Sequence, residues 1–136
     1  MYVSDPRDTF SRAIEELTRA KASGDELGVR QAAEKAWLAV VEATDQYLLR
    51  NHNIRVSPDE RAHSERRRYL HMLGKGDLER NYGYLSQTLH GDIFYLGEPV
   101  SPGRMRGFLE EAATFVEETT GTTGLVQLVR ERVPAS

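Results

Sequence analysis

The sequence predicts an all-α protein, an antiparallel bundle of five to six helices in a single domain over residues 1–136. Apolar residues recur every three or four positions over several long segments, which is the periodicity of one buried helix face. Capping residues and glycines separate these segments at short intervals. No segment shows the alternation of apolar and polar residues that is typical of a strand. Helices joined by such short connections pack antiparallel.

The segment Val29–Leu48 predicts the central helix of the bundle. Trp37, the only tryptophan, lies in the middle of its apolar face beside small alanines, so a second helix can cover the indole ring. We therefore expect Trp37 to be buried. The residues that form this face are Val29, Ala33, Ala36, Trp37, Val40, Thr44, Tyr47 and Leu48.

The first helix is expected to begin at Asp5-Pro6, where an aspartate can cap free amides and proline fits the first turn. Gly24 is expected to end it, and Asp25 to cap the second helix, which runs to about Arg50. The first apolar stripe consists of Phe10, Ala13, Ile14, Leu17 and Ala20.

Ser57 predicts the start of a third helix over Pro58–Leu73, with Glu60 reaching back as in a capping box. Arg66 projects into the thin apolar stripe of this helix. A fourth helix is expected over Asp77–Tyr95.

A fifth helix is expected over Pro102–Thr119 with Ser101 as its cap. A glycine-containing turn leads to a short last helix that ends before Pro134.

Composition excludes several classes of protein. Apolar residues make up 39% and charged residues 29% of the chain, which is ordinary for a globular protein. The net charge of −3 gives no indication that the protein binds nucleic acid or an acidic membrane. The absence of cysteine excludes disulfides and thiolate metal sites. We expect no signal peptide and no membrane span, because no charged start precedes an apolar run and no apolar stretch reaches ~18 residues. These features fit a cytoplasmic protein.

Residues 61–75 form a basic segment with two interpretations. Its arginines and histidines can hold a phosphate backbone or stabilise a phosphoryl transition state. Alternatively, they are a solvated face that pairs with nearby acids such as Asp59, Glu60 and Glu65. The basic residues are Arg61, His63, Arg66, Arg67, Arg68, His71 and Lys75.

His90 and Phe94 lie four residues apart and off the main apolar face of the fourth helix. They predict either a pocket that includes Arg80 and Gln87 or an anchor in a homodimer interface, and we favour the dimer.

Glu60 and His63 have the spacing of a di-iron ligand pair, but no second Glu-x-x-His occurs. We therefore predict no metal site. No glycine-rich phosphate loop is present, and we predict no cofactor.

Two segments resemble a known family. AAEKAWLAVVEA (Ala32–Ala43) resembles the Ala-x-Glu-Lys-x-Trp signature of archaeal paralogous-repeat proteins. LHGDIFYLGEPV (Leu89–Val100) is similar to their Leu-His-x-x-Phe-Tyr segment, with one additional residue between His and Phe. That group is similar to the HEPN superfamily of small helical nucleotide-binding domains.

The resemblance implies an HEPN-like bundle that dimerises and binds nucleotide, RNA or a protein partner such as a nucleotidyltransferase or an antitoxin. We expect a binding module rather than an enzyme, with Arg67, Arg68, Arg80 and His90 as ligand-binding residues. One alternative is a metal-independent, toxin-like endoribonuclease. The Arg-x4-His spacing of Arg66 and His71 then supplies the catalytic pair. The other alternative is a purely structural dimerisation protein.

Overall fold

A computed structural model describes residues 5–135 of the chain, and the prediction of an all-α bundle is confirmed. No strand occurs within these residues. The helices are α1 (Pro6–Ser23), α2 (Glu26–His52), α3 (Ala62–Met72), α4 (Gly76–Leu85), η1 (Ser86–Tyr95), α5 (Pro102–Thr120) and α6 (Leu125–Arg132).

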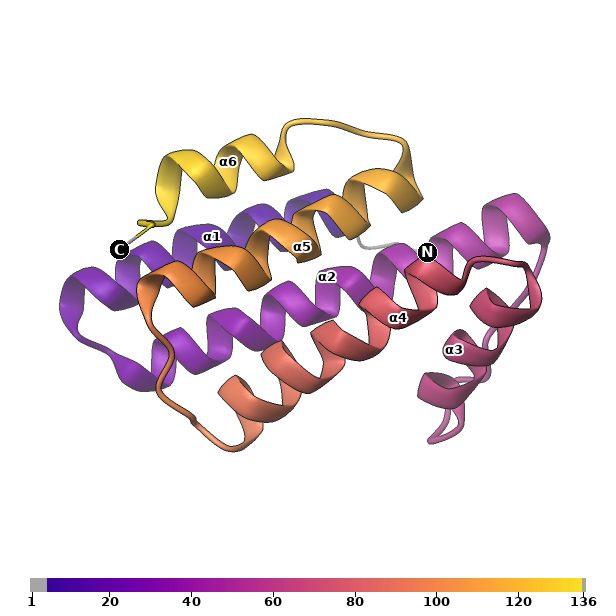
Figure 1. Ribbon diagram of the computed structural model, residues 1–136, viewed down its shortest axis with the longest axis horizontal. Coiled ribbons are helices and arrows are strands. Elements are labelled where there is room, and N and C mark those ends of the chain that lie inside the picture. Colours follow the sequence, from indigo (N-terminus) through magenta and orange to yellow (C-terminus); the bar gives the residue numbers. More distant parts are fainter. Residues whose placement is uncertain (1–4, 136) are drawn as a thin grey trace.

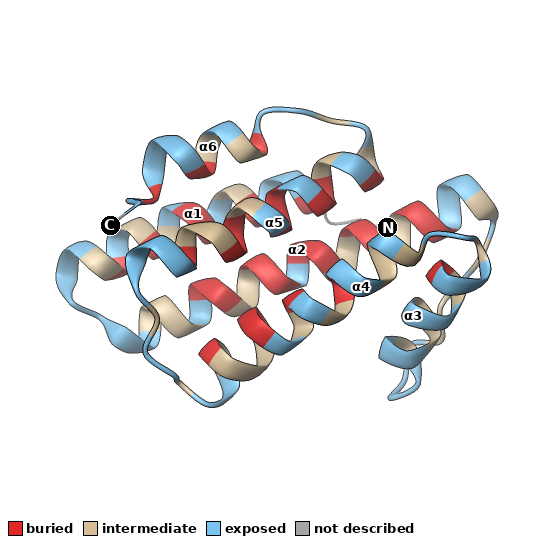
Figure 2. Cartoon of the chain, viewed as in Figure 1, coloured by how far each residue is buried: buried red, intermediate tan, exposed pale blue. Residues whose placement is uncertain are grey.

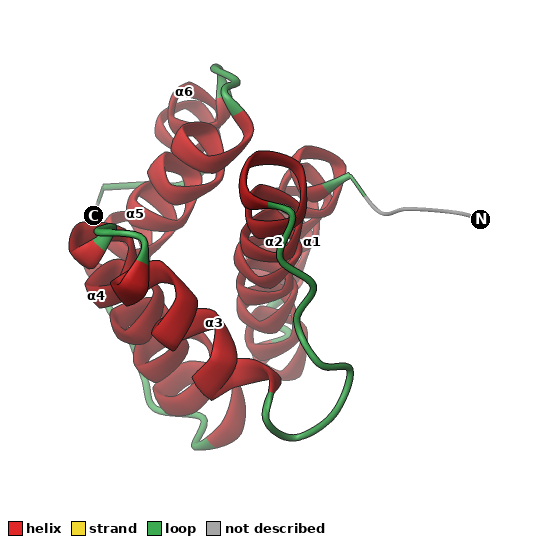
Figure 3. Cartoon of the chain, turned by 90° about the vertical axis from the view of Figure 1, so that its right-hand side faces the viewer, coloured by secondary structure: helices red, strands yellow, loops and turns green. Residues whose placement is uncertain are grey.

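The body of the molecule consists of α1, α2, α5 and the segment formed by α4 and η1 (Figure 1). α1 and α2 form one antiparallel hairpin, and α4 with its continuation η1 forms a second hairpin with α5. α6 returns along α1 and α5. α3 lies outside this body, beside α4, and a loop connects it to α2 (Figure 3). None of the helices in residues 5–135 has both the length and the apolar character that crossing a membrane requires.

α2 is the central helix, as predicted, because it contacts α1, α5 and η1. Trp37 is only 7% exposed. A stripe of small residues on α2 lets α1 approach closely: a Cβ atom added to Gly28 would lie 2.9 Å from the Cβ atom of Ala20. Figure 2 shows buried positions along most of α2. The buried alanines of the stripe are Ala32, Ala36, Ala39 and Ala43.

The predicted caps of three helices are confirmed. The side chains of Asp5, Asp25 and Ser101 accept hydrogen bonds from backbone N–H groups at the start of α1, α2 and α5. Gly24 ends α1 with a φ of 69°, a left-handed conformation that costs glycine little. These local interactions fix both ends of the α1–α2 connection.

The predicted start of the third helix is wrong. α3 begins at Ala62, and Ser57 does not cap it. Instead, Ser57 donates from its backbone nitrogen and its hydroxyl to the carboxylate of Glu65, at 2.9 and 2.8 Å. Glu60, the expected capping partner, is exposed. These hydrogen bonds from Ser57 lower the pKa of Glu65 and hold the preceding loop against α3.

The predicted fourth helix changes its winding at Ser86. Residues Ser86–Tyr95 form a π-helix, with backbone bonds to the fifth preceding residue. Its C-terminal end is held from another helix, because the guanidinium of Arg30 donates to the carbonyl oxygens of Phe94, at 2.7 and 3.0 Å, and of Tyr95, at 3.2 Å. The π-helix therefore carries a tertiary contact that a continuous α-helical pattern did not predict.

The buried alanine stripe makes α2 intolerant of larger side chains. Ala39→Leu should lower the free energy of unfolding by about 1–3 kcal/mol, because the added methyl groups overpack the core. Gln31→Leu, on the exposed side of the same helix, should change it by no more than about 0.5 kcal/mol. Chemical denaturation of both variants measures the difference, and equal effects would contradict the packing described here.

Candidate functional site

The inner face of α3 combines polar and apolar residues. His63, Arg66, Arg67 and Leu70 follow the spacing that places side chains on one side of a helix. Leu70 is completely buried, which identifies this side as the one that faces the bundle. Arg66 and Arg67 are therefore directed at α2 and α4 rather than at open solvent.

Arg66 joins three helices. Its Nε and Nη2 atoms donate to the two carboxylate oxygens of Asp45 on α2, at 2.7 and 3.0 Å. Its Nη1 atom donates to the hydroxyl of Tyr82 on α4, at 3.3 Å. The Arg66 side chain is 13% exposed, and such a paired geometry compensates for the loss of water around the guanidinium.

Arg67 lies across α4, where its Nε and Nη2 atoms donate to Oε2 of Glu79 at 3.0 and 2.7 Å. A Cβ atom added to Gly83 would lie 3.1 Å from Cζ of Arg67, so this glycine leaves room for the guanidinium. The Nη1 atom of Arg67 has no partner within residues 5–135. The side chain is 47% exposed and can reach a ligand.

His63 packs against two aromatic rings. Its ring centroid lies 5.2 Å from that of Tyr82 and 6.3 Å from that of Trp37. Desolvation lowers the pKa of His63, and the positive charges of Arg67 and Arg66 act in the same direction. His63 is therefore mostly neutral near pH 7, and neither ring nitrogen has a hydrogen-bond partner in the described part of the chain.

His90 lies on η1, and its ring centroid is 6.2 Å from that of Trp37. Its Nδ1 atom faces both carboxylate oxygens of Glu34, at 2.8 and 2.9 Å. Because a carboxylate can only accept, Nδ1 carries the proton and Nε2 stays available to a ligand. Phe94 stacks on the imidazole, with 6.1 Å between the ring centroids, so the imidazole is held in one orientation.

We call the group formed by His63, Arg66, Arg67, His90, Trp37 and Tyr82 the α2–α3–η1 site. Its guanidinium groups and one imidazole each face a carboxylate, from Asp45, Glu79 and Glu34. The site therefore has no excess of positive charge while both imidazoles are neutral. An open groove of about 360 Å³ continues from Trp37 and Glu34 along α2. The other residues that line the groove are Gln31, Lys35, Leu38 and Val41.

The structure brings together three of the predicted site residues, Arg66, Arg67 and His90. It does not bring Arg66 and His71 together, because residues five apart on an α-helix differ in direction by roughly 140°. His71 is exposed and has no side-chain partner within residues 5–135.

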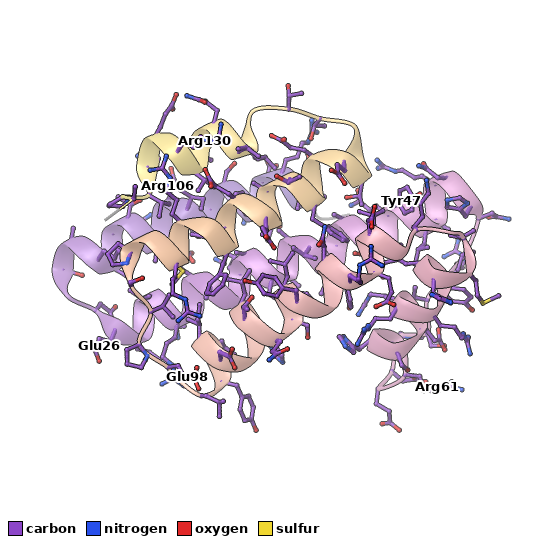
Figure 4. The ribbon with its side chains drawn as sticks, in the orientation of Figure 1. Glu26, Tyr47, Arg61, Glu98, Arg106 and Arg130 are labelled. Carbon is purple, nitrogen blue, oxygen red and sulfur yellow. The ribbon has the colours of Figure 1, made fainter. Side chains whose placement is uncertain are left out.

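The other two predicted ligand-binding residues lie outside the site. Arg68 is exposed and covers the ring of Tyr69, and Arg80 is exposed and pairs with Asp77. The interpretation of the basic segment as a solvated face therefore applies to its exposed residues. Arg61, at the edge of the molecule in Figure 4, pairs with Asp59.

His63 was grouped with the basic segment but not chosen as a site residue. The available signal was its spacing to Leu70, which places it on the inward side of α3. No sequence signal identified Asp45, Glu79 or Glu34 as partners, because each lies on a different helix from the group that it faces. Within residues 5–135 no group of three or more His, Asp or Glu side chains is placed to hold a metal ion.

Comparison of the chain with protein-family models, with curated proteins and with solved structures gives no match. The resemblance to the HEPN superfamily therefore stays a prediction.

The bonds of Arg66 should stabilise the fold as well as the site. Arg66→Met should lower the free energy of unfolding by about 1–3 kcal/mol, because charged hydrogen bonds to Asp45 and Tyr82 are lost. Arg61→Met removes a guanidinium from an exposed pair of the same segment and should leave the stability nearly unchanged. Urea denaturation compares the two, and an Arg66 variant as stable as the Arg61 variant would show that the buried pair contributes nothing.

Proposed function

We propose that this chain binds a phosphate-bearing ligand, a nucleotide or RNA, at the α2–α3–η1 site. The observation that carries the proposal is the pair of imidazoles, His63 and His90, whose ring centroids lie 6.3 and 6.2 Å from that of Trp37, with the unused Nη1 donor of Arg67 close to His63. Hydrogen-bond donors of this kind are the groups that bind phosphate oxygens. The HEPN resemblance supports the same class of ligand.

Ligand binding at this site should depend on protonation. The three carboxylates of the site outnumber its two guanidinium groups, so the repulsion of a bound anion falls when His63 takes up a proton. The lowered pKa of His63 means that the free protein is mostly unprotonated there near pH 7. Affinity should therefore rise as the pH falls, and binding should be accompanied by proton uptake.

The groove beside the site supports a nucleotide over a simple anion. Leu38 and Val41 give it apolar surface, and Leu38 is 47% exposed. A nucleobase placed there would cover this surface, while its phosphate would lie toward the imidazoles. The polar and apolar parts of the site thus match the two parts of a nucleotide.

Binding is measured by fluorescence anisotropy of a labelled single-stranded RNA oligonucleotide, at low and high salt. We expect the affinity to increase by at least about fivefold between pH 8 and pH 5, because His63, whose pKa is lowered, acquires its charge at the acid end of this interval. His63→Gln should remove most of the pH dependence. Arg67→Gln should weaken binding by about tenfold.

Arg80→Gln is the matched control, since it removes one exposed guanidinium outside the site. It should change the affinity by less than about twofold. Equal losses in the Arg67 and Arg80 variants would contradict a specific site. Affinity that is independent of pH in the wild-type protein would contradict the role of the histidines.

A second function is favoured by one further observation, the different surroundings of the two imidazoles. His90 is oriented by Glu34, whereas His63 has a lowered pKa and no hydrogen-bond partner in the described residues. In RNA cleavage, a neutral His63 would accept the proton of a ribose 2′-hydroxyl. A protonated His90 would donate one to the departing 5′-oxygen, leaving a 2′,3′-cyclic phosphate and a 5′-hydroxyl.

This alternative predicts cleavage of RNA but not of the same oligonucleotide with 2′-deoxy sugars. His63→Ala should reduce the rate by at least about 100-fold, whereas His71→Ala should leave it unchanged. The products are separated on a denaturing gel. Cleavage that persists in the His63 variant would exclude this mechanism, and loss of cleavage in the His71 variant would favour the Arg-x4-His pair instead.

The homodimer and the nucleotidyltransferase or antitoxin partner also belong to this proposal. Exposed apolar side chains support an interface, among them Tyr95 and Leu96, which are 74% and 65% exposed. Light scattering of the purified protein determines whether it forms dimers.

A further inference from the structure

A second cleft lies at the end of the bundle where α1 turns into α2. It has a volume of about 560 Å³, in the range of clefts that hold small ligands. Figure 4 shows Glu26, from the start of α2, and Glu98, from the loop before α5, at this same end. Ile93 and Met105, both 2% exposed, belong to its lining. The cleft shares no lining residue with the α2–α3–η1 site.

Charged groups of both signs line this cleft without satisfying one another. The ammonium of Lys21 and the carboxylates of Glu26 and Glu98 have no side-chain hydrogen bond or ion pair within residues 5–135. Elsewhere on the α1–α2 hairpin, Lys35 does pair with Glu16 at 2.6 Å. Arg30 also lines the cleft, and its Nη1 atom is not used in the bonds that hold the end of η1.

The lining of the cleft also includes apolar residues. Leu27 lines the cleft and is 58% exposed, and Val29 and Val100 contribute further aliphatic surface. A molecule that covers this surface binds more tightly, because apolar area is removed from water. The complementary ligand therefore has an aliphatic body.

We propose that this cleft binds a small zwitterion with an aliphatic body, of which a free aliphatic amino acid is the simplest form. Its ammonium group would pair with Glu26 and Glu98, and its carboxylate with Lys21 and Arg30. A ligand with only one charge leaves the charged groups of the other sign unpaired. The unpaired groups of both signs thus select a zwitterion over a simple amine or acid.

The test uses four probes in a ¹H–¹⁵N NMR titration of the full chain. Leucine has both charges and the aliphatic body, glycine lacks the body, and 3-methylbutylamine and 4-methylpentanoate each keep one charge. We expect saturable shifts with leucine at the amides of residues 26–30 and 97–100. The other three probes should bind at least about fivefold more weakly.

Two variants connect the binding to the proposed groups. Glu26→Gln/Glu98→Gln and Lys21→Met should each weaken leucine binding by about tenfold. The first variant removes both partners of the ligand ammonium group, and the second removes one partner of its carboxylate. Glu15→Gln/Glu118→Gln removes two exposed carboxylates from outside the cleft and should leave the affinity unchanged.

Three results would overturn the proposal. They are the absence of saturable shifts with leucine up to about 20 mM, equal affinity for leucine and 3-methylbutylamine or 4-methylpentanoate, and unchanged leucine binding in the cleft variants. None of these results bears on RNA or nucleotide binding at the α2–α3–η1 site, so the two proposals fail independently.

Discussion

The ion pair between Arg66 and Asp45 determines where α3 lies, and the α2–α3–η1 site depends on that position. Leu70 is the α3 residue that the bundle buries completely, and burying one leucine contributes only about 1.5–3 kcal/mol. Tyr69 is only partly buried against the same core. The polar contacts of α3 are directional: Arg66 reaches α2 and α4, and Arg67 reaches Glu79. Directional bonds fix the rotation of the helix, so they also place His63 against the aromatic rings.

The carboxylates that hold these cations also decide what the site can do. A cluster of arginines without acids would attract any polyanion, but here the guanidinium charges are balanced by acids on α2 and α4. The variable charge resides on His63, whose pKa is lowered by desolvation and by the neighbouring guanidinium groups. This arrangement explains why the site is proposed to respond to pH. The cleft near Glu26, at the other end of α2, differs because its charges are not satisfied within the described chain.

Features set by local sequence were predictable, and features set by distant residues were not. Asp25 caps α2 through a residue three positions away, so the prediction needed only the neighbouring sequence. The choice of Glu65 over Glu60 as the partner of Ser57 depends on how the loop folds back on α3. The carbonyl oxygen of Phe94, near the end of the π-helix, accepts a hydrogen bond from Arg30, which lies 64 positions earlier in the chain. No local sequence pattern reveals such a contact. In the site, the cations were predictable as residue types, but their carboxylate partners come from other helices.

The titration of His63 tests the central claim most directly, which is that α3 presses this imidazole against Trp37 and Tyr82 beside two guanidinium groups. NMR follows the ring protons of each histidine with pH, and single substitutions assign the signals. The structure predicts that His63 titrates below the ordinary value of about 6.5 and moves toward it in Arg66→Met, where both the anchor and a nearby charge are lost. A wild-type pKa for His63 at or above that value would contradict the account.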